Sequence, residues 1–272
     1  MMPALPNRGL CVGMHANEIC INCDRRVAEP AQKYCPGCGQ PTPVHRIDWH
    51  FLGHELEHSV LHMDRGILYS LKLLMLQPGR LLRDYIEGRR GNQVKPLLLI
   101  TMMSAAVVLL NKLVSGGSLM DGGASQAVAT NQAVPAQLQQ FMLASAAVGE
   151  WVSGHFAAFT LMLLPIEALV FWFVFRRFSR LNYPEWLVVT TLLTVQTFVI
   201  WLLLIPLHRW LPFVQSLAGL MGMIYAAASL MHFFAARPLW STLWRTLLAF
   251  GVFSVISSML VLGATLVVMW VA

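Results

Sequence analysis

Long hydrophobic stretches dominate the chain from residue 96 to its end. Each approaches the roughly twenty apolar residues that an α-helix needs to cross a lipid bilayer. Five such stretches predict five transmembrane helices, at Leu97–Val114, His155–Phe175, Trp186–Leu207, Phe213–Phe234 and Leu247–Val271. The segment 115–154 is rich in Gly, Ala, Ser and Gln, and we expect it to be a loop. The pattern predicts an all-α membrane protein with its transmembrane domain over residues 96–272.

Residues 47–95 carry shorter, amphipathic patterns. After Asp48, a candidate N-cap, apolar residues recur at helical spacing and predict a helix. The apolar run Ile67–Leu76 is too short to cross a bilayer, and we expect it to be interfacial or re-entrant. A second amphipathic helix is expected between Pro78 and Gly88, lying on the membrane surface, packed on the membrane domain, or both. The cations expected to face anionic lipid headgroups are Arg80, Arg83, Arg89, Arg90 and Lys95.

The composition supports membrane insertion. Of the 272 residues, 57% are hydrophobic and 12% are charged, whereas a soluble domain of this length carries about twice that charged fraction. An ordinary soluble domain is therefore excluded. Residues 1–19 have no periodicity and are expected to form a flexible tail, with Cys11 as a free thiol. Because this tail does not resemble a signal peptide, the N-terminus is expected to stay on the inner side.

Two C-x-x-C pairs lie ahead of the hydrophobic segments, Cys20-Ile-Asn-Cys23 and Cys35-Pro-Gly-Cys38. A tight turn can bring both sulfurs of a pair onto one ion, and two such turns complete a closed tetrahedral site. Gly37 and Gly39 are expected to supply positive φ angles in the second turn, and Asp24 tolerates one after the first. Residues 20–40 therefore predict a zinc-ribbon-like knuckle whose structural zinc supplies most of its folding free energy. The alternative is a redox dithiol or a disulfide pair.

Two independent arguments place the N-terminus in the cytoplasm. Zinc-binding thiolates need a reducing compartment, and the cytosol is one. With the cysteines inside, the inner segments hold most of the cations, whereas the outer segments hold Lys112 and Arg209, as the positive-inside rule requires. Five spans then put Ala272 outside.

Several short motifs accompany the cysteine pairs, namely Asp64-Arg65-Gly66, Gln77-Pro78-Gly79, Asp84-Tyr85-Ile86-Glu87-Gly88-Arg89-Arg90 and Lys95-Pro96. From about Cys20 to Leu110 the chain resembles an uncharacterised family of bacterial zinc-ribbon membrane proteins, catalogued as a domain of unknown function. The Pro-Gly…Tyr-x-x-Gly-Arg-Arg spacing is the most specific part of this resemblance. Asp24 departs from it, since a Gly commonly follows the first pair. The resemblance implies a multi-pass protein of the bacterial inner membrane and no known activity.

His54-Glu55-Leu56-Glu57-His58 matches the H-E-x-x-H motif of zinc peptidases. On a helix, His54 and His58 can bind one metal while Glu55 activates the bound water. A peptidase also needs a third protein ligand, and neither Glu87 nor Glu185, which is expected in a short loop, is a convincing one. The alternative is a solvated polar face, or a ladder that binds a transition metal weakly or senses pH, made of His50, His54, His58 and His62.

Glu167 lies near the middle of the second predicted span, two residues after Pro165. A carboxyl group at that depth is costly, so it is a candidate site for a small-solute or lipid transporter. Alternatively, a protonated Glu167 shares an interhelical hydrogen bond with Gln196 or Tyr225.

The sequence favours a non-enzymatic interaction or membrane-organising module, in which the knuckle engages a protein partner and the helices anchor it. The membrane metallopeptidase and the transporter are the alternatives. Nucleic-acid binding is not expected, because no aromatic side chains interleave with the basic run. Association into a homo-oligomer is left open.

Overall fold

The computed structural model describes residues 19–25, 33–42, 44, 46–58, 66–115, 135–210 and 213–271. Within these ranges the side chains of residues 54–58, 115, 208–209 and 215 are not part of the description. Residues 1–18 of the predicted tail over residues 1–19, including the thiol of Cys11, lie outside the described residues. The same holds for His62 of the histidine ladder.

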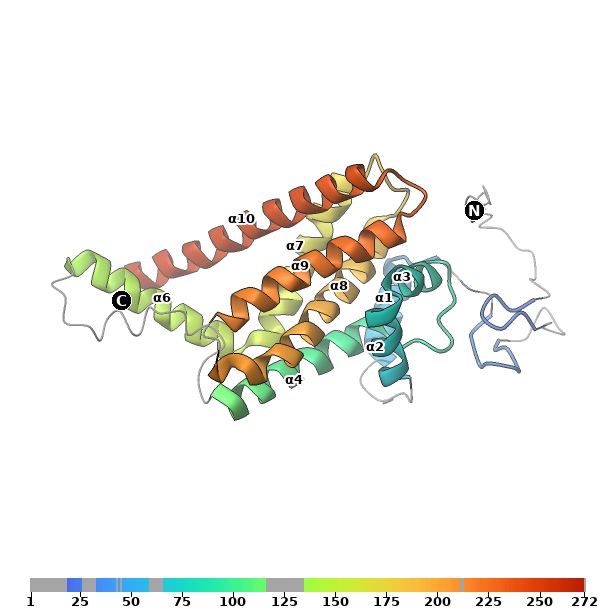
Figure 1. Ribbon diagram of the computed structural model, residues 1–272, viewed down its shortest axis with the longest axis horizontal. Coiled ribbons are helices and arrows are strands. Elements are labelled where there is room, and N and C mark those ends of the chain that lie inside the picture. The colour runs from blue at the N-terminus through green and yellow to red at the C-terminus, as the bar shows by residue number, and fades with distance from the viewer. Residues whose placement is uncertain are drawn as a thin grey trace. The chain divides into compact units, whose positions relative to one another are not determined.

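The described part of the chain is helical (Figure 1). Its helices are α1 (Trp49–His58), α2 (Ile67–Leu76), α3 (Pro78–Ile86), α4 (Pro96–Ser115), α6 (Ala136–Gly154), α7 (Phe156–Phe175), α8 (Tyr183–Leu204), the 3-10 helix η1 (Ile205–Arg209), α9 (Val214–Phe233) and α10 (Leu239–Val271). No strand occurs in this described part, where an isolated bridge joins Tyr34 to Pro41. The predicted all-α fold class is confirmed.

Among the described residues, five helices are long and apolar enough to cross a membrane, as predicted. They are Pro96–Val114, Phe156–Phe175, Tyr183–Leu207, Ser216–Phe233 and Leu239–Val271. The last begins at Leu239 rather than at the expected Leu247, and α10 reaches 33 residues. The two amphipathic helices expected in this region are present as α1 and α3, and the run Ile67–Leu76 forms the helix α2. Asp48 is the N-cap of α1, since its Oδ1 accepts the Phe51 N–H at 2.8 Å.

The predicted loop over residues 115–154 is wrong in its second half, because α6 occupies Ala136–Gly154. The Gly residues that suggested a loop are concentrated before residue 124, whereas the later part is rich in the helix formers Ala, Leu, Gln and Met. Ala144, Val148 and Val152 recur every four residues and are buried, so they form one face of α6. His155 alone separates α6 from α7.

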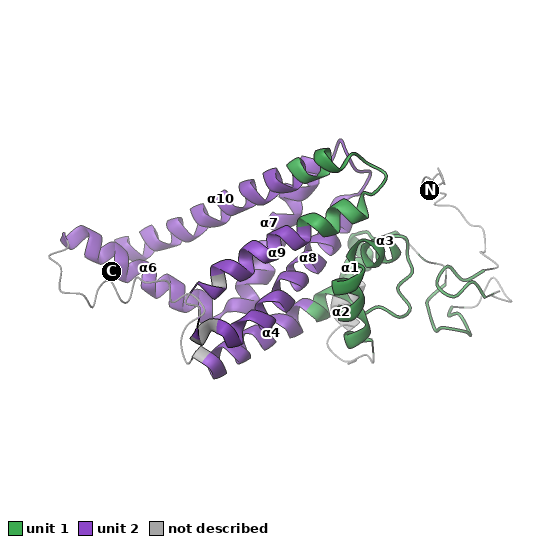
Figure 2. Cartoon of the chain, viewed as in Figure 1, with its two compact units in different colours: residues 1–99, 227–244 green, residues 100–226, 245–272 purple. Residues whose placement is uncertain are grey.

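The chain divides into two compact units, each built from two separate parts of the sequence (Figure 2). The first contains residues 1–99 and 227–244, and the second contains residues 100–226 and 245–272. The second unit is centred on the packing of α7 against α8. Trp186 of α8 is fully buried between Phe171 and Phe175 of α7, with ring centroids 5.7 and 5.0 Å apart.

Close helix packing in the second unit depends on a small residue of α9. A Cβ added to Gly222 would lie 2.6 Å from Thr197 Cγ2 of α8, so only glycine allows the observed approach. Ala218, one turn earlier on α9, is fully buried. Small residues four positions apart let membrane helices approach closely, as they do here.

In the first unit, α3 packs on the C-terminal end of α9. A Cβ on Gly79 would lie 2.7 Å from the carbonyl carbon of His232 and 2.9 Å from the Phe233 nitrogen. Arg83, one turn further along α3, donates to the His232 carbonyl oxygen at 3.0 Å. A cation at the end of a helix stabilises its last carbonyl groups. The two residues therefore hold α3 against the last turn of α9.

The α3 helix ends in a Schellman motif at Gly88, where the sequence predicted its end. The Arg89 N–H donates to the Asp84 carbonyl oxygen at 2.7 Å, and the Gly88 N–H donates to the Tyr85 carbonyl oxygen at 3.2 Å. Gly88 has φ +97, and a Cβ there would lie 2.6 Å from Val44 Cγ1. Glycine is thus required at position 88 for two reasons, the positive φ angle and the close contact with Val44.

Candidate metal centre

The four predicted cysteine ligands lie together. All four Sγ atoms are within 4.8 Å of one another, with Cys20–Cys38 at 3.7 Å and Cys23–Cys35 at 3.5 Å. Sulfurs on a tetrahedral ion with metal–sulfur bonds of about 2.3 Å would be about 3.8 Å apart. A disulfide would need sulfurs at about 2.05 Å, and all four residues have free thiols. The residues present therefore fit a tetrahedral metal ion, and the disulfide alternative does not match this geometry.

Both cysteine turns close with the same two backbone hydrogen bonds. In the first turn, the Cys20 N–H donates to the Arg25 carbonyl oxygen at 2.8 Å, and the Cys20 carbonyl oxygen accepts the Asp24 N–H at 2.9 Å. In the second turn, the Cys35 N–H donates to the Gln40 carbonyl oxygen, and the Cys35 carbonyl oxygen accepts the Gly39 N–H, both at 2.8 Å. This repetition presents two sulfurs from each turn to one point.

The fourth residue after the first cysteine of each turn adopts the left-handed conformation. Asp24 has φ +56 and Gly39 has φ +72, as the sequence predicted for both. Asp24 thus occupies the position at which the resembling family commonly has Gly, and Asp is among the residues that tolerate this angle. The expectation of a positive φ at Gly37 is wrong. Its lack of a side chain instead accommodates Arg25, whose Cδ would lie 2.5 Å from a Cβ at Gly37.

The four thiols differ in acidity. The Gly37 N–H, pointing at the sulfur, is the main cause that lowers the pKa of Cys35 to about 6. Burial raises the pKa of Cys20. The Arg25 N–H lowers the pKa of Cys23, but burial and the neighbouring thiols together raise it to about 12. One thiolate forms readily, and further negative charge so close to it needs a cation, which a metal ion would supply.

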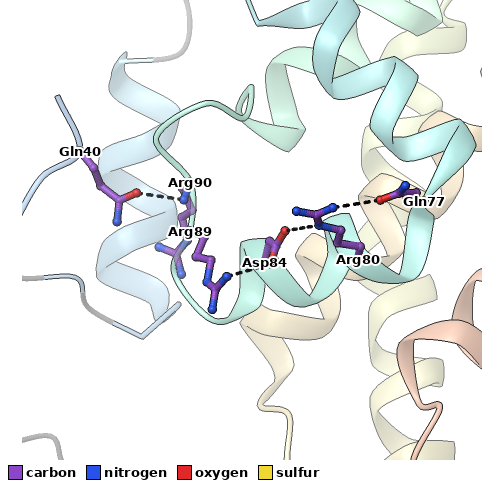
Figure 3. Close-up of polar contacts among 6 residues, drawn as sticks. All are labelled: Gln40, Gln77, Arg80, Asp84, Arg89 and Arg90. Atoms are coloured by element: carbon purple, nitrogen blue, oxygen red, sulfur yellow. Dashed lines mark hydrogen bonds and ion pairs between the residues drawn. The ribbon is translucent and has the colours of Figure 1, made fainter. Parts of the chain in front are cut away.

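A side chain that the sequence analysis missed connects this centre to the rest of the first unit. Gln40, two residues after Cys38, is 3% exposed. Its Nε2 donates to the Gly88 carbonyl oxygen at 2.8 Å, and its Oε1 accepts the Gly91 N–H at 2.9 Å. The same Oε1 accepts the Arg90 N–H at 3.1 Å (Figure 3). No spacing or composition signal marks this Gln, because its role depends on a turn about fifty residues away in the sequence.

The Gly88–Gly91 turn also approaches the first cysteine turn. A Cβ on Gly91 would lie 2.6 Å from Asn22 Nδ2 and 3.3 Å from Gln40 Oε1. Asn22 lies between the two cysteines of the first pair. Both cysteine turns therefore contact this turn, and the missing side chain of Gly91 allows them to do so.

The five cations predicted to face lipid headgroups have different surroundings. The Arg90 guanidinium lies over the rings of Phe51 and Tyr85, 4.4 and 5.3 Å from their centroids, and its Nε donates to the Tyr85 carbonyl oxygen at 2.9 Å. Arg83 is bonded to α9, as described above, and Lys95 is half-buried. Arg90 and Arg83 thus make contacts inside the protein.

Arg80 and Arg89 remain exposed, with side chains 67% and 53% accessible. They share the carboxylate of Asp84 at 3.6 and 3.9 Å, and Arg80 also donates to Gln77 Oε1 at 3.3 Å (Figure 3). Exposed ion pairs of this kind are weak and exchange readily with other anions.

The H-E-x-x-H motif lies on α1, so its backbone is helical as expected, but the side chains of His54, Glu55 and His58 lie outside the described residues. Among the described side chains, the four cysteines are the one group of three or more metal-binding residues. Glu185 does not lie in a loop as predicted. It is buried in the first turn of α8 and forms a capping box with Asn182, with two hydrogen bonds of 2.8 Å.

Glu167 is 6% exposed on α7, and its Oε2 accepts a hydrogen bond from Thr194 Oγ1 of α8 at 3.2 Å. The sequence analysis did not single out Thr194, because a threonine in an apolar helix carries no positional signal. Gln196, one of the two partners expected from the sequence, is fully buried on α8. Pro165 lies inside α7, as expected.

Residues 64–107 are similar to a family whose description reads "Protein of unknown function (DUF3667)". This segment includes α2, α3, the Gly88–Gly91 turn and part of α4, and it begins after the cysteine turns. No match was found among curated proteins or among solved structures.

Proposed function

We propose that this chain is a multi-pass protein of the bacterial inner membrane whose cytosolic knuckle holds one structural zinc ion and serves as a non-enzymatic interaction module. The observation that carries this proposal is the set of four thiols at tetrahedral spacing. Four sulfur ligands in this arrangement suit zinc or an iron–sulfur centre, and a pair of C-x-x-C turns ahead of the helices is typical of a zinc site. With four protein ligands no position is left for a substrate, so the role of the metal is structural.

Two properties of the chain support the proposed orientation. Thiolates persist in a reducing compartment, which supports a cytosolic knuckle. The cations at the ends of the apolar helices are concentrated on the same side as the knuckle when the five helices alternate in direction. In this orientation Arg80 and Arg89 are available to anionic headgroups of the inner leaflet.

Exposed apolar side chains beside the cysteines support a protein partner. Ile19 and Tyr34 are 52% and 61% exposed, although each adjoins a buried cysteine in the sequence. Aromatic residues on such a surface are typical anchors of protein interfaces. The knuckle would then recruit its partner to the membrane surface.

Metal analysis of the purified protein tests the central claim. We expect one zinc per chain by plasma mass spectrometry, retained after dialysis, and its loss in Cys35→Ser. Cys11→Ser is the control and is expected to keep the metal. Iron with visible absorbance, or no bound metal in protein prepared under reducing conditions, would contradict the proposal.

Reporter fusions test the orientation. A fluorescent protein that matures in the cytosol should be bright when fused ahead of Met1, and alkaline phosphatase should be active when fused after Ala272. The reversed result at either terminus would refute the proposed topology.

A transporter is the second candidate, favoured by one observation. Glu167 is buried on an apolar helix, and its described hydrogen-bond partner is the neutral Thr194. Buried carboxyl groups in spanning helices mark proton and ion pathways. The test is proton flux into proteoliposomes loaded with a pH-sensitive dye, under a potassium diffusion potential. Glu167→Gln should abolish a flux that the exposed control Glu150→Gln retains, whereas a wild type without flux would dismiss this proton-coupled activity.

A further inference from the structure

Gln40 belongs to the metal centre and to the Gly88–Gly91 turn at the same time. Its backbone carbonyl oxygen accepts the Cys35 N–H at 2.8 Å and so closes the second cysteine turn. Its side chain makes the three hydrogen bonds to Gly88, Arg90 and Gly91 described above. Since Cys38 is two residues away, a metal ion on the cysteines would fix the position from which this side chain reaches the turn.

The hydrogen bond from Gln40 to the Gly88 carbonyl oxygen is buried, and the bonds that Gln40 accepts from Arg90 and Gly91 are partly buried. Gln40 is 3% exposed, and Gly88 is also buried. A buried backbone group that loses its partner is costly unless water reaches it, so removal of the Gln40 amide favours opening of the turn. The turn connects α3 to the segment before α4, and its Arg90 lies over Phe51 of α1. Opening of the turn would therefore change the positions of the basic residues Arg89 and Arg90 at the end of α3.

We propose that metal binding by the four cysteines latches the Gly88–Gly91 turn through Gln40, and that metal loss releases the turn. The proposal rests on the proposed function, because it requires a metal on the cysteines. A knuckle this small depends on its metal for folding. Without the metal, residues 35–40 would no longer be held as a turn. Ordering them and the Gln40 side chain against the Gly88–Gly91 turn would then cost more free energy than the hydrogen bonds of Gln40 contribute. The metal state of the knuckle thereby controls the order of the basic turn.

Limited proteolysis with trypsin reads out the turn directly, because Arg89 and Arg90 are two adjacent cleavage sites within it. Cleavage requires a local opening of the backbone, so its rate reports the population of the open turn. The full chain, purified in lipid nanodiscs with a C-terminal tag, is treated with and without a zinc chelator. Tagged fragments that begin at Arg90 or Gly91 are quantified by mass spectrometry, and zinc is measured in the same samples.

We expect chelation to raise the initial cleavage rate after Arg89 and Arg90 by about ten-fold or more. Gln40→Ala, fully loaded with zinc, should show a similar increase while it still holds one metal per chain. Gln77→Ala is the matched control and should cleave as slowly as the wild type, because Gln77 is exposed. Cleavage after Arg177, outside the first unit, is the internal reference and should not change.

If Gln40→Ala fails to bind metal, Gln40→Met provides the second test, because Met keeps the length of the side chain without its hydrogen bonds. A zinc-loaded Gln40→Met protein that resists trypsin like the wild type would overturn the latch. So would a chelated wild type that is cleaved at the original rate after its zinc has been lost. In both cases the zinc measurements would still support the proposed metal site, and only the latch would be refuted. A wild type that binds no zinc would refute the proposed function and the latch together.

Discussion

Substitution of Gly79 by Ala tests the contact between α3 and the end of α9. An added Cβ would lie 2.6 to 2.9 Å from three atoms of His232 and Phe233, and two of these atoms belong to the backbone. Ordinary contacts begin near 3.4 Å, so the two helices must separate by about 0.8 Å. A backbone cannot rotate away as a long side chain can, and the separation must therefore be taken up by moving α3.

The magnitude follows from three contributions. Forced separation of well-packed elements costs about 1–3 kcal/mol. The same movement stretches the 3.0 Å hydrogen bond from Arg83 to the His232 carbonyl oxygen, and this exposed bond contributes about 1 kcal/mol. Ala gains about 0.5–1 kcal/mol over Gly inside a helix, which acts in the opposite direction. We expect Gly79→Ala to lower the free energy of unfolding by about 2 kcal/mol.

Thermal unfolding of the detergent-solubilised protein, followed by size-exclusion chromatography of a fluorescent fusion, measures the effect. A loss of this size corresponds to a decrease in Tm of about 4–8 °C. Gly53→Ala on α1, where nothing lies within 4 Å of an added Cβ, is the matched control and should unfold at the wild-type temperature or slightly above it. Arg83→Gln removes the hydrogen bond alone and should cause a smaller decrease.

The reasoning fails if Gly79→Ala unfolds at the same temperature as Gly53→Ala, because the close approach of α3 to α9 would then be unnecessary. It also fails if Arg83→Gln causes the larger decrease. In that case the hydrogen bond, and not the steric contact, would hold the two helices together.

Two further predictions concern the second unit. Asn182→Ala removes the capping box of α8 and should lower the free energy of unfolding by about 1 kcal/mol, whereas Gln137→Ala at the exposed start of α6 should have no effect in the same thermal assay. Gly222→Ala should cost about 1–3 kcal/mol through its contact with Thr197, and Thr197→Ala should restore part of the loss. Gly219→Ala, on the same helix with nothing within 4 Å, is its control, and an equal effect of the two glycine substitutions would contradict the packing argument.

The apolar helices and the cysteine cluster were predictable because their signals are local. A span is recognised by the hydropathy of about twenty consecutive residues, whatever they pack against. Two cysteines three positions apart present their sulfurs together through one tight turn, and this requires nothing from the rest of the chain. The N-cap Asp48 and the closing Gly88 are equally local features, and the structure has both in place.

Features that depend on distant residues were not predictable. Gly79 belongs to the Gln77-Pro78-Gly79 motif, but its contact is His232, in another part of the sequence. Thr194 opposite Glu167 and Gln40 opposite Gly91 are likewise paired across many residues. The error at α6 has a different cause. Residues 115–154 were treated as one segment, although the sequence changes within it from Gly-rich to Ala- and Gln-rich.

The residues of the segment similar to the unknown-function family make structural contacts in the first unit. Gly79 and Arg83 fit α3 to α9, and Gly88 and Gly91 admit Val44, Asn22 and Gln40. Arg90, one of the cations predicted to face lipid headgroups, packs on two aromatic rings of the protein. Among the described residues of this segment, no group of three or more metal-binding side chains is present. Within the first unit, these residues link the cysteine turns to α3 and α3 to the end of α9, and substitutions of them should first be interpreted as changes in those contacts.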